Sequence, residues 1–152
     1  LASALLNMGR LFEAEGMYRA NLAAKLRKLG PEHIDTLMAA MNLGSALKEV
    51  GRYDEAREIF RENHLTKARV LGKGHADTCF AALNLVALCV DGQPHEGGAS
   101  ALGGRYEEAE GMANAAVAAL RATFGEEHPS VLSATVHVGM VLTASGRAEQ
   151  AV

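Results

Sequence analysis

The chain has 152 residues, of which 49% are hydrophobic and 22% are charged, as in an ordinary globular protein. Its 15 basic and 18 acidic residues give a net charge of −3, which argues against a nucleic-acid binder because such proteins usually carry a strong basic excess. No apolar run approaches the ~18 residues of a membrane span, so no membrane insertion is expected. Cys79 and Cys89 lack a zinc or redox spacing, which predicts reduced, buried thiols in a cytoplasmic protein.

Three short motifs recur along the chain in one phase. The first occurs four times, with offsets of 42, 53 and 42: GRLFEAE (9–15), GRYDEAR (51–57), GRYEEAE (104–110) and GRAEQAV (146–152). The second motif occurs three times, with offsets of 42 and 53: LGPEHIDTL (29–37), LGKGHADTC (71–79) and FGEEHPSVL (124–132). The third motif has the same offsets: NLGSAL (42–47), NLVALC (84–89) and HVGMVL (137–142). A fixed period of this length indicates a repeat array. The units are residues 1–34 (partial), 35–76, 77–129 (with an insertion) and 130–152 (partial).

Each complete unit is predicted to form two helices. The first ten residues, LASALLNMGR, have the pattern of a helix interior without a helix start. We therefore expect a partial first unit and a fragment of a larger protein. In the first complete unit, apolar residues at steps of three and four predict helices from about Asp35 to Val50 and from about Asp54 to Leu71. A connection of about three residues makes the pair antiparallel, and the chain would hold about seven helices. The predicted helix ends are N-caps at Asp35, Asp77 and Ser130 and stops at Gly51 and Gly72.

Small residues are expected where the two helices of a hairpin cross. A large side chain there would hold the helices apart, so Gly44 and Ala56 are predicted at crossing points, with Val86 and Ala109 in the next unit. Hairpins of this kind cannot bury their apolar faces alone, and they stack side by side. The uncapped ends of the array are therefore expected to fray or to cause self-association.

One unit carries 11 additional residues around GGASALGGRY, at 97–106. A phosphate-binding loop would need Lys and Ser or Thr where Gly104 and Arg105 stand, so no nucleotide site is predicted there. Gly104-Arg105-Tyr106 instead aligns with the predicted turn at Gly51-Arg52-Tyr53. Residues 91–103 are accordingly expected to form a flexible loop before an ordinary inter-helix turn.

The stretch LGPEHIDTLMAAMNLGSALKEVGRYDEA resembles the long, 42-residue form of the tetratricopeptide repeat found in kinesin light chains and their relatives. The resemblance covers the chain except for roughly 90–103. It implies an all-α, right-handed superhelical solenoid of antiparallel helix hairpins that acts as a protein-interaction scaffold without a cofactor. It also implies a cytoplasmic location, with the cytoskeleton as one candidate site. The alternative is a regulatory or sensor segment of a nucleotide-binding signalling protein.

In this family the first helix of each hairpin lines a concave groove that holds a protein or peptide ligand. The alignment carries that role to four residues in each of three units: Met38, Met41, Asn42 and Ser45; Phe80, Leu83, Asn84 and Ala87; and Ser133, Val136, His137 and Met140. An asparagine both donates and accepts, so Asn42 and Asn84 would hold a peptide backbone or, alternatively, brace a neighbouring helix. The methionines would adapt to varied partners or serve as core. Since no Lys or Arg occupies these positions, a clamp for a terminal carboxylate or an acidic peptide is not predicted.

Two further sets of repeated residues were considered as a metal site and a catalytic site. His33, His75 and His128 recur before the first helix of a unit, but neighbouring helices lie ~8–10 Å apart, too far for one shared metal ion. We expect these histidines to bond the backbone and fix the loop. Glu13, Glu55 and Glu108 also recur once per unit, which is typical of architecture rather than of a catalytic pair. Neither an enzyme nor a metal site is predicted.

Overall fold

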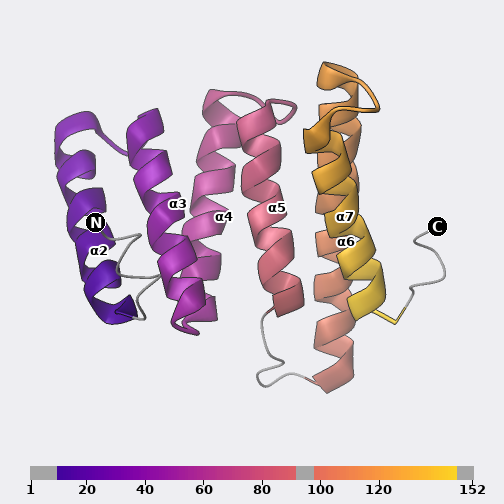
Figure 1. Ribbon diagram of the computed structural model, residues 1–152, viewed down its shortest axis with the longest axis horizontal. Coiled ribbons are helices and arrows are strands. Elements are labelled where there is room, and N and C mark those ends of the chain that lie inside the picture. The colour runs from indigo at the N-terminus through magenta and orange to yellow at the C-terminus, as the bar shows by residue number, and fades with distance from the viewer. Residues whose placement is uncertain (1–9, 92–97, 147–152) are drawn as a thin grey trace. The chain divides into compact units, whose positions relative to one another are not determined.

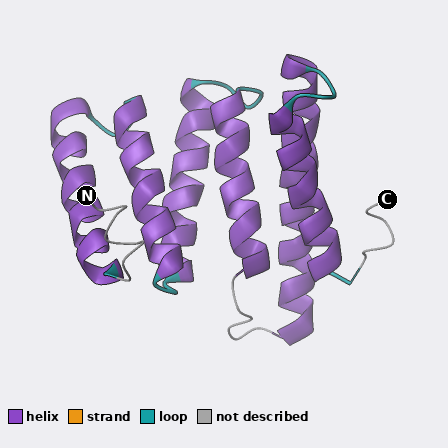
Figure 2. Cartoon of the chain, in the orientation of Figure 1, coloured by secondary structure: helices purple, strands orange, loops and turns teal. Residues whose placement is uncertain are grey.

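The structure, a computed structural model, describes residues 10–91 and 98–146. These residues form six α-helices and no strand (Figures 1 and 2). The helices are α2 (Leu11–Leu29), α3 (Ile34–Glu49), α4 (Tyr53–Val70), α5 (Ala76–Asp91), α6 (Gly98–Phe124) and α7 (Pro129–Ala144). The chain divides into two units, Leu1–Val70 with α2 to α4 and Leu71–Val152 with α5 to α7. The seventh helix expected from the sequence falls on residues 1–9, outside the described part of the chain.

In the first unit, α3 packs against both α2 and α4, which run antiparallel to it (Figure 1). The bounds of α3 and α4 lie one residue from those predicted, and the antiparallel hairpin is confirmed. Leu37, Leu43 and Leu47 of α3 are at most 5% exposed, and so are Ala56 and Phe60 of α4. Full burial of one large apolar side chain contributes about 1.5–3 kcal/mol, so this packed face, more than helix propensity, holds the hairpin together.

The turn between α3 and α4 depends on Gly51. Its φ of 81° lies in the left-handed region that a side chain would strain, as predicted for a helix-ending glycine. The Gly51 N–H donates to the Lys48 carbonyl at 3.0 Å, and the Arg52 N–H donates to the Leu47 carbonyl at 2.9 Å. This pair of bonds is a Schellman motif, which satisfies the last carbonyls of α3 and redirects the chain.

Histidine side chains satisfy the first amides of the helices that open each hairpin. In all three cases Nδ1 accepts from the backbone N–H two residues on: His33 from Asp35 (3.1 Å), His75 from Asp77 (3.2 Å) and His128 from Ser130 (3.2 Å). The predicted backbone-bonding role of these histidines is therefore confirmed. The predicted N-caps at the three receiving residues are wrong, because the helices begin one residue earlier and place those residues in the first turn. An aspartate there still interacts favourably with the helix dipole.

The ring of Phe60 on α4 lies against Gly44 on α3, as predicted for a close crossing. A Cβ atom at Gly44 would lie only 2.3 Å from Cε1 of Phe60. In the second unit the repeat register places Val86 and Ala113 at these positions, and both belong to one buried cluster. The larger residue is thus on the second helix of the hairpin in one repeat (Phe60) and on the first helix in the next (Val86). The small residue occupies the facing helix in both cases.

Four charged side chains link α2 to the start of α4. Glu15, which is 7% exposed, accepts from Arg19 at 2.8 Å and from Arg52 at 2.6 Å. Glu55 completes the network, with Arg19 at 3.1 Å and Arg52 at 2.5 Å. The hydrogen bond from Arg19 and then the charge of Arg52 lower the pKa of Glu15, although burial opposes the shift. The repeated glutamate Glu55 is therefore part of the architecture, as the sequence predicted.

In the second unit, α6 packs against both α5 and α7, and α5 also contacts α7. The core is rich in small residues from all three helices, and its fully buried members include Val86, Ala113, Leu120, Val131 and Val141. Alanines at the contacts let the helices approach closely, as the sequence predicted for Ala109, which is 1% exposed. No helix among the residues that the structure describes is long and apolar enough to cross a membrane.

The insertion is the main departure from the predicted fold. Helix α6 begins at Gly98 and runs without a break through Gly104-Arg105-Tyr106, so both the predicted turn and the predicted loop over 98–103 are wrong. Compared with α4, eight of the 11 additional residues lengthen the helix and three lengthen the connection. Extending an existing helix needs no new nucleation step, and each internal glycine lowers helix stability by only about 1 kcal/mol relative to alanine. The first turns of α6 consequently project beyond the end of α5 (Figure 1).

The contact between Gly44 and Phe60 predicts a large effect of a single methyl group. Gly44→Ala should lower the free energy of unfolding by about 1–3 kcal/mol, because the ring must move to admit the Cβ atom. The double change Gly44→Val with Phe60→Ala, which reproduces the pair of the next repeat, should recover part of this loss. Urea denaturation followed by circular dichroism measures both effects.

Gly139 provides a matched control, since it occupies the same register position on α7. Among the described residues, no atom outside the adjoining turns of α7 lies within 4 Å of a Cβ built there, so Gly139→Ala should be neutral or should stabilise the helix by up to about 1 kcal/mol. Equal stabilities of Gly44→Ala and Gly139→Ala would show that the aromatic contact does not constrain the hairpin.

The ion-pair network predicts a stability difference that depends on pH. Because the pKa of Glu15 is lowered from 4.5 in the folded chain, its contribution is fully present above that pH and is lost as the pH falls through the folded value. Glu15→Gln should cost about 1 kcal/mol at neutral pH, measured by urea denaturation, and progressively less below pH 4.5. Glu58→Gln, an exposed carboxylate on the same unit, is the control and should have little effect at any pH. A Glu15→Gln loss that stays constant down to pH 2 would exclude an ionic origin.

Candidate partner-binding groove

The residues assigned to a groove on α3 form an exposed stripe. Met38, Asn42 and Ser45 are exposed at steps of four and three, and Met38 retains 55% of its surface. Met41 lies beside them and is half-buried. The opposite side of α3 is buried in the first unit, so these four positions belong to the side of the helix that a partner can reach.

On α5 the assigned residues differ in their accessibility. Phe80 is 37% exposed, and Asn84 and Ala87 are half-buried. Leu83 is only 4% exposed because it lies in the buried cluster of the second unit with Val86. A partner cannot reach Leu83 without unpacking that core, so this residue does not belong to an accessible surface of the second unit.

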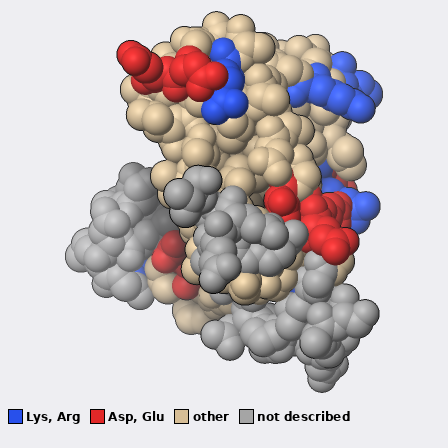
Figure 3. Space-filling model, turned by 90° about the vertical axis from the view of Figure 1, so that its right-hand side faces the viewer, with Lys and Arg blue, Asp and Glu red and all other residues tan. Residues whose placement is uncertain are grey.

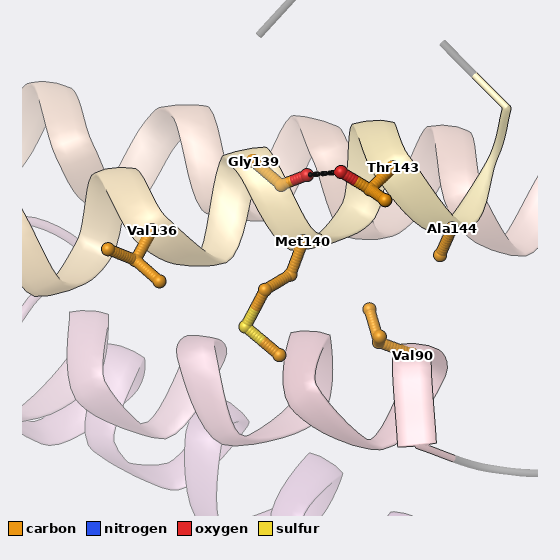
Figure 4. Close-up of a pocket in the computed structure, with 6 residues that line it drawn as sticks. All are labelled: Val90, Val136, Gly139, Met140, Thr143 and Ala144. Carbon is orange, nitrogen blue, oxygen red and sulfur yellow. Dashed lines mark hydrogen bonds between the residues drawn. The ribbon is translucent and has the colours of Figure 1, made fainter. Parts of the chain in front are cut away.

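An open groove of about 470 Å³ lies between α5 and α7 (Figure 4). Its lining consists of one residue from the end of α5 and five from α7: Val90, Val136, Gly139, Met140, Thr143 and Ala144. The Met140 side chain extends from α7 toward α5, with Val136 and Ala144 on either side of it along the helix. The structure therefore joins two of the residues assigned from the sequence, Val136 and Met140, in one groove.

The other four lining residues were not singled out by the sequence. Gly139 could have been recognised, because it shares the register of Gly44 and a missing side chain next to a helix contact opens space. Val90, Thr143 and Ala144 carry no such signal. Their place in the groove depends on how α5 and α7 pack, which repeat alignment does not provide.

The described lining of the groove is uncharged. Helix α7 contains no Asp, Glu, Lys or Arg, and α5 contains only Asp77 and Asp91 near its ends. In the view of Figure 3, uncharged side chains form a broad area, and acidic and basic groups gather toward its upper and right-hand edges. The Thr143 hydroxyl donates to the Gly139 carbonyl at 2.9 Å, which leaves the lining without a free hydroxyl proton (Figure 4).

The polar residues near the groove are partly engaged by their own helix. His137 is half-buried, and its Nδ1–H donates to the Ser133 carbonyl at 2.8 Å. The Ser133 side chain is exposed on the same face. His137 thus bonds a carbonyl of its own helix and not of a neighbouring one, while Ser133 presents a hydroxyl to solvent.

Three of the groups considered for catalysis have structural surroundings or partners. Glu55 is bound by two arginines, and Glu13 pairs with Arg10. Cys79 is 3% exposed, and burial raises the pKa of its thiol, which keeps it protonated and unreactive. Both observations agree with the structural roles that the sequence predicts for these residues.

Comparison with known proteins identifies the family. Two models described as tetratricopeptide repeat match residues 1–63 and 100–130, which together span more than half of the chain. No curated protein sequence matches the chain.

A solved structure shares the repeat fold. BtubC (BKLC) from P. vanneervenii superposes with a TM-score of 0.78 at 21% sequence identity, over 99% of this chain and 56% of its own. This chain therefore spans little more than half of that protein. A kinesin light chain-like protein of Podosopora anserina with nearly identical TPR-like repeats gives a TM-score of 0.49 at 21% identity, over 99% of this chain and 86% of its own. From the family matches and the hairpin geometry, the chain belongs to the tetratricopeptide repeat family and is an all-α scaffold for protein interactions.

Proposed function

We propose that the groove between α5 and α7 binds an uncharged, apolar segment of a protein partner. The observation that carries the proposal is the open groove of about 470 Å³ whose six lining residues include no charged side chain. Transfer of apolar surface from water into such a groove is favourable by roughly 25 cal/mol per Å². A charged group would lose its hydration there without gaining a partner of opposite sign.

The shape and composition of the groove suit a side chain projecting from a partner segment. Met140 is long, unbranched and polarizable, so it can adjust to partners of different shape. Val136 is 61% exposed and adds apolar surface that no described residue covers. Such a groove fits the apolar face of an amphipathic helix or one anchor residue of an extended peptide.

The exposed stripe of α3 provides a second surface for a partner in the first unit. Asn42 offers both a donor and an acceptor to a peptide backbone, and Met38 supplies apolar contact beside it. The position of this stripe on the first helix of a hairpin agrees with the groove expected from the resemblance to kinesin light chain repeats. We infer that α3 offers a partner mainly polar contacts, whereas the groove of the second unit offers apolar ones.

A peptide array tests the proposal, with uncharged amphipathic, acidic and basic peptides of equal length as probes. The purified chain should bind the uncharged amphipathic set. Val136→Asp should weaken that binding at least tenfold, which corresponds to about 1.4 kcal/mol, because the carboxylate is desolvated beside apolar contacts. Fluorescence anisotropy of a labelled peptide from the array measures the affinity.

Leu65→Asp is the matched control, since Leu65 is an equally exposed aliphatic residue, at 58%, on α4 and outside the groove. Its affinity should equal that of the unaltered chain, and circular dichroism should show unchanged helicity for both variants. Equal losses in the two variants, or binding confined to the acidic or basic peptides, would refute the proposed site.

A further inference from the structure

Three histidines directly precede the helices that open the hairpins: His33 before α3, His75 before α5 and His128 before α7. In each of them Nδ1 accepts from the backbone N–H two residues further on, at 3.1 or 3.2 Å. A ring nitrogen accepts a hydrogen bond only while it carries no proton, so each imidazole is neutral, with its proton on Nε2. The first turns of α3, α5 and α7 therefore depend on uncharged rings.

Protonation of Nδ1 removes this bond and adds a charge of unfavourable sign. An imidazolium has two N–H donors and no acceptor, so the amide in the first turn loses its partner. The positive end of the helix dipole lies at the same amides and repels a cation. Histidine is the side chain that ordinarily gains its proton between about pH 8 and pH 5. Since the folded caps exclude protons that the unfolded chain binds, the free energy of unfolding falls as the pH falls through this range.

The charged groups around His33 do not favour its protonated form. Glu32, next to it in the chain, pairs with Arg69 of α4. Asp35 lies 3.9 Å from Lys25 of α2. The remaining charged residues in the last turns of these two helices are basic: Arg27 and Lys28 on α2 and Lys67 on α4. An imidazolium at His33 thus meets no uncompensated carboxylate among the described residues of this loop.

The second unit places two carboxylates beside its histidines. Glu127 precedes His128 in the chain, and Asp77 follows His75 by two residues. The other charged groups at this end of the unit are an ion pair at 2.9 Å and a lysine: Glu126 with Arg121 of α6, and Lys73. Glu127 and Asp77 partly stabilise an imidazolium, so the effect of protonation is expected to be largest at His33.

We propose that the three capping histidines form a proton-sensitive switch, which releases the first turns of α3, α5 and α7 between about pH 7.5 and pH 5. One cap recurs in each hairpin and all three act in the same direction, so the response accumulates along the array. The same helices carry the surfaces assigned to a partner. Acidification therefore also weakens partner binding, and only this last step rests on the proposed function.

Nuclear magnetic resonance of the ¹⁵N-labelled chain tests the switch without any substitution. At about pH 7.5 the ring nitrogen shifts of the three histidines should report the Nε2–H tautomer. At about pH 5 the hydrogen-exchange protection factors of the receiving amides, those of Asp35, Asp77 and Ser130, should be at least about fivefold lower. The protection of Leu47, in the interior of α3, should change less than about twofold. A protonated Nδ1 at neutral pH, or protection that persists after the rings are protonated, would overturn the proposal.

Asparagine variants separate the caps from other titrating groups. Asparagine is a strong N-cap that does not titrate, so the triple change His33→Asn, His75→Asn and His128→Asn should abolish the fall in urea midpoint that acidification causes in the unaltered chain. His33→Asn alone should remove a larger share of this fall than His75→Asn. His137→Asn is the control and should leave the pH dependence unchanged, because the Nδ1–H of His137 donates to the Ser133 carbonyl and protonation keeps that bond. Equal falls in the triple variant and the unaltered chain would refute the switch.

Peptide binding tests the coupling to a partner, with uncharged amphipathic peptides as probes because they do not titrate. Their affinity for the unaltered chain should be at least about fivefold lower at pH 5 than at pH 7.5, and their affinity for the triple asparagine variant should be equal at both. The same weakening in both proteins would refute the coupling. Peptides that bind at neither pH would refute the proposed function alone, since the exchange and denaturation results decide the switch.

Discussion

Close contact between the two helices of a hairpin is the constraint on which the rest of this structure depends. Protein interiors are packed as densely as organic crystals, so the combined volume at such a contact is fixed while its division between the helices is not. Gly44 and Phe60 satisfy the constraint in one repeat, and Val86 and Ala113 satisfy it in the next with the sizes exchanged. At Gly139 the small residue recurs, and among the described residues no atom outside its own helix lies within 4 Å of a Cβ atom built there. Gly139 also lines the groove between α5 and α7.

Most of the fold could be predicted because it is set by local rules that a sequence displays. The period of the motifs predicted the helix hairpins. The spacing of apolar residues predicted the bounds of α3 and α4 to within one residue. Gly51 was recognisable since a left-handed turn strongly favours glycine. The caps were misassigned because aspartate and serine are common N-caps, whereas here the imidazole of a preceding histidine accepts from the same amide. The repeated histidine was visible in the sequence, but its hydrogen-bond geometry was not.

The remaining differences come from contacts between residues far apart in the sequence. Aligning Gly104-Arg105-Tyr106 with an earlier turn assumed that one motif always adopts one conformation, yet here an adjoining helix extends through it. Register alone also placed Leu83 on the same face as Val136, although the packing of α5 buries Leu83 and leaves Val136 exposed. A repeat alignment gives the direction of a side chain on its own helix. Its accessibility depends on the neighbouring helices, which differ from repeat to repeat.

This distinction separates the architecture of the array from its binding chemistry. Residues that recur in every unit, such as the capping histidines, have hydrogen bonds or packing contacts that any hairpin of this kind needs. The candidate groove instead depends on a position where the repeats disagree, because Met140 corresponds to Ser45 and Ala87. A change at such a position alters one surface or cavity and leaves the caps and turns intact. An array can therefore acquire an apolar groove in one unit while a single hairpin design is preserved.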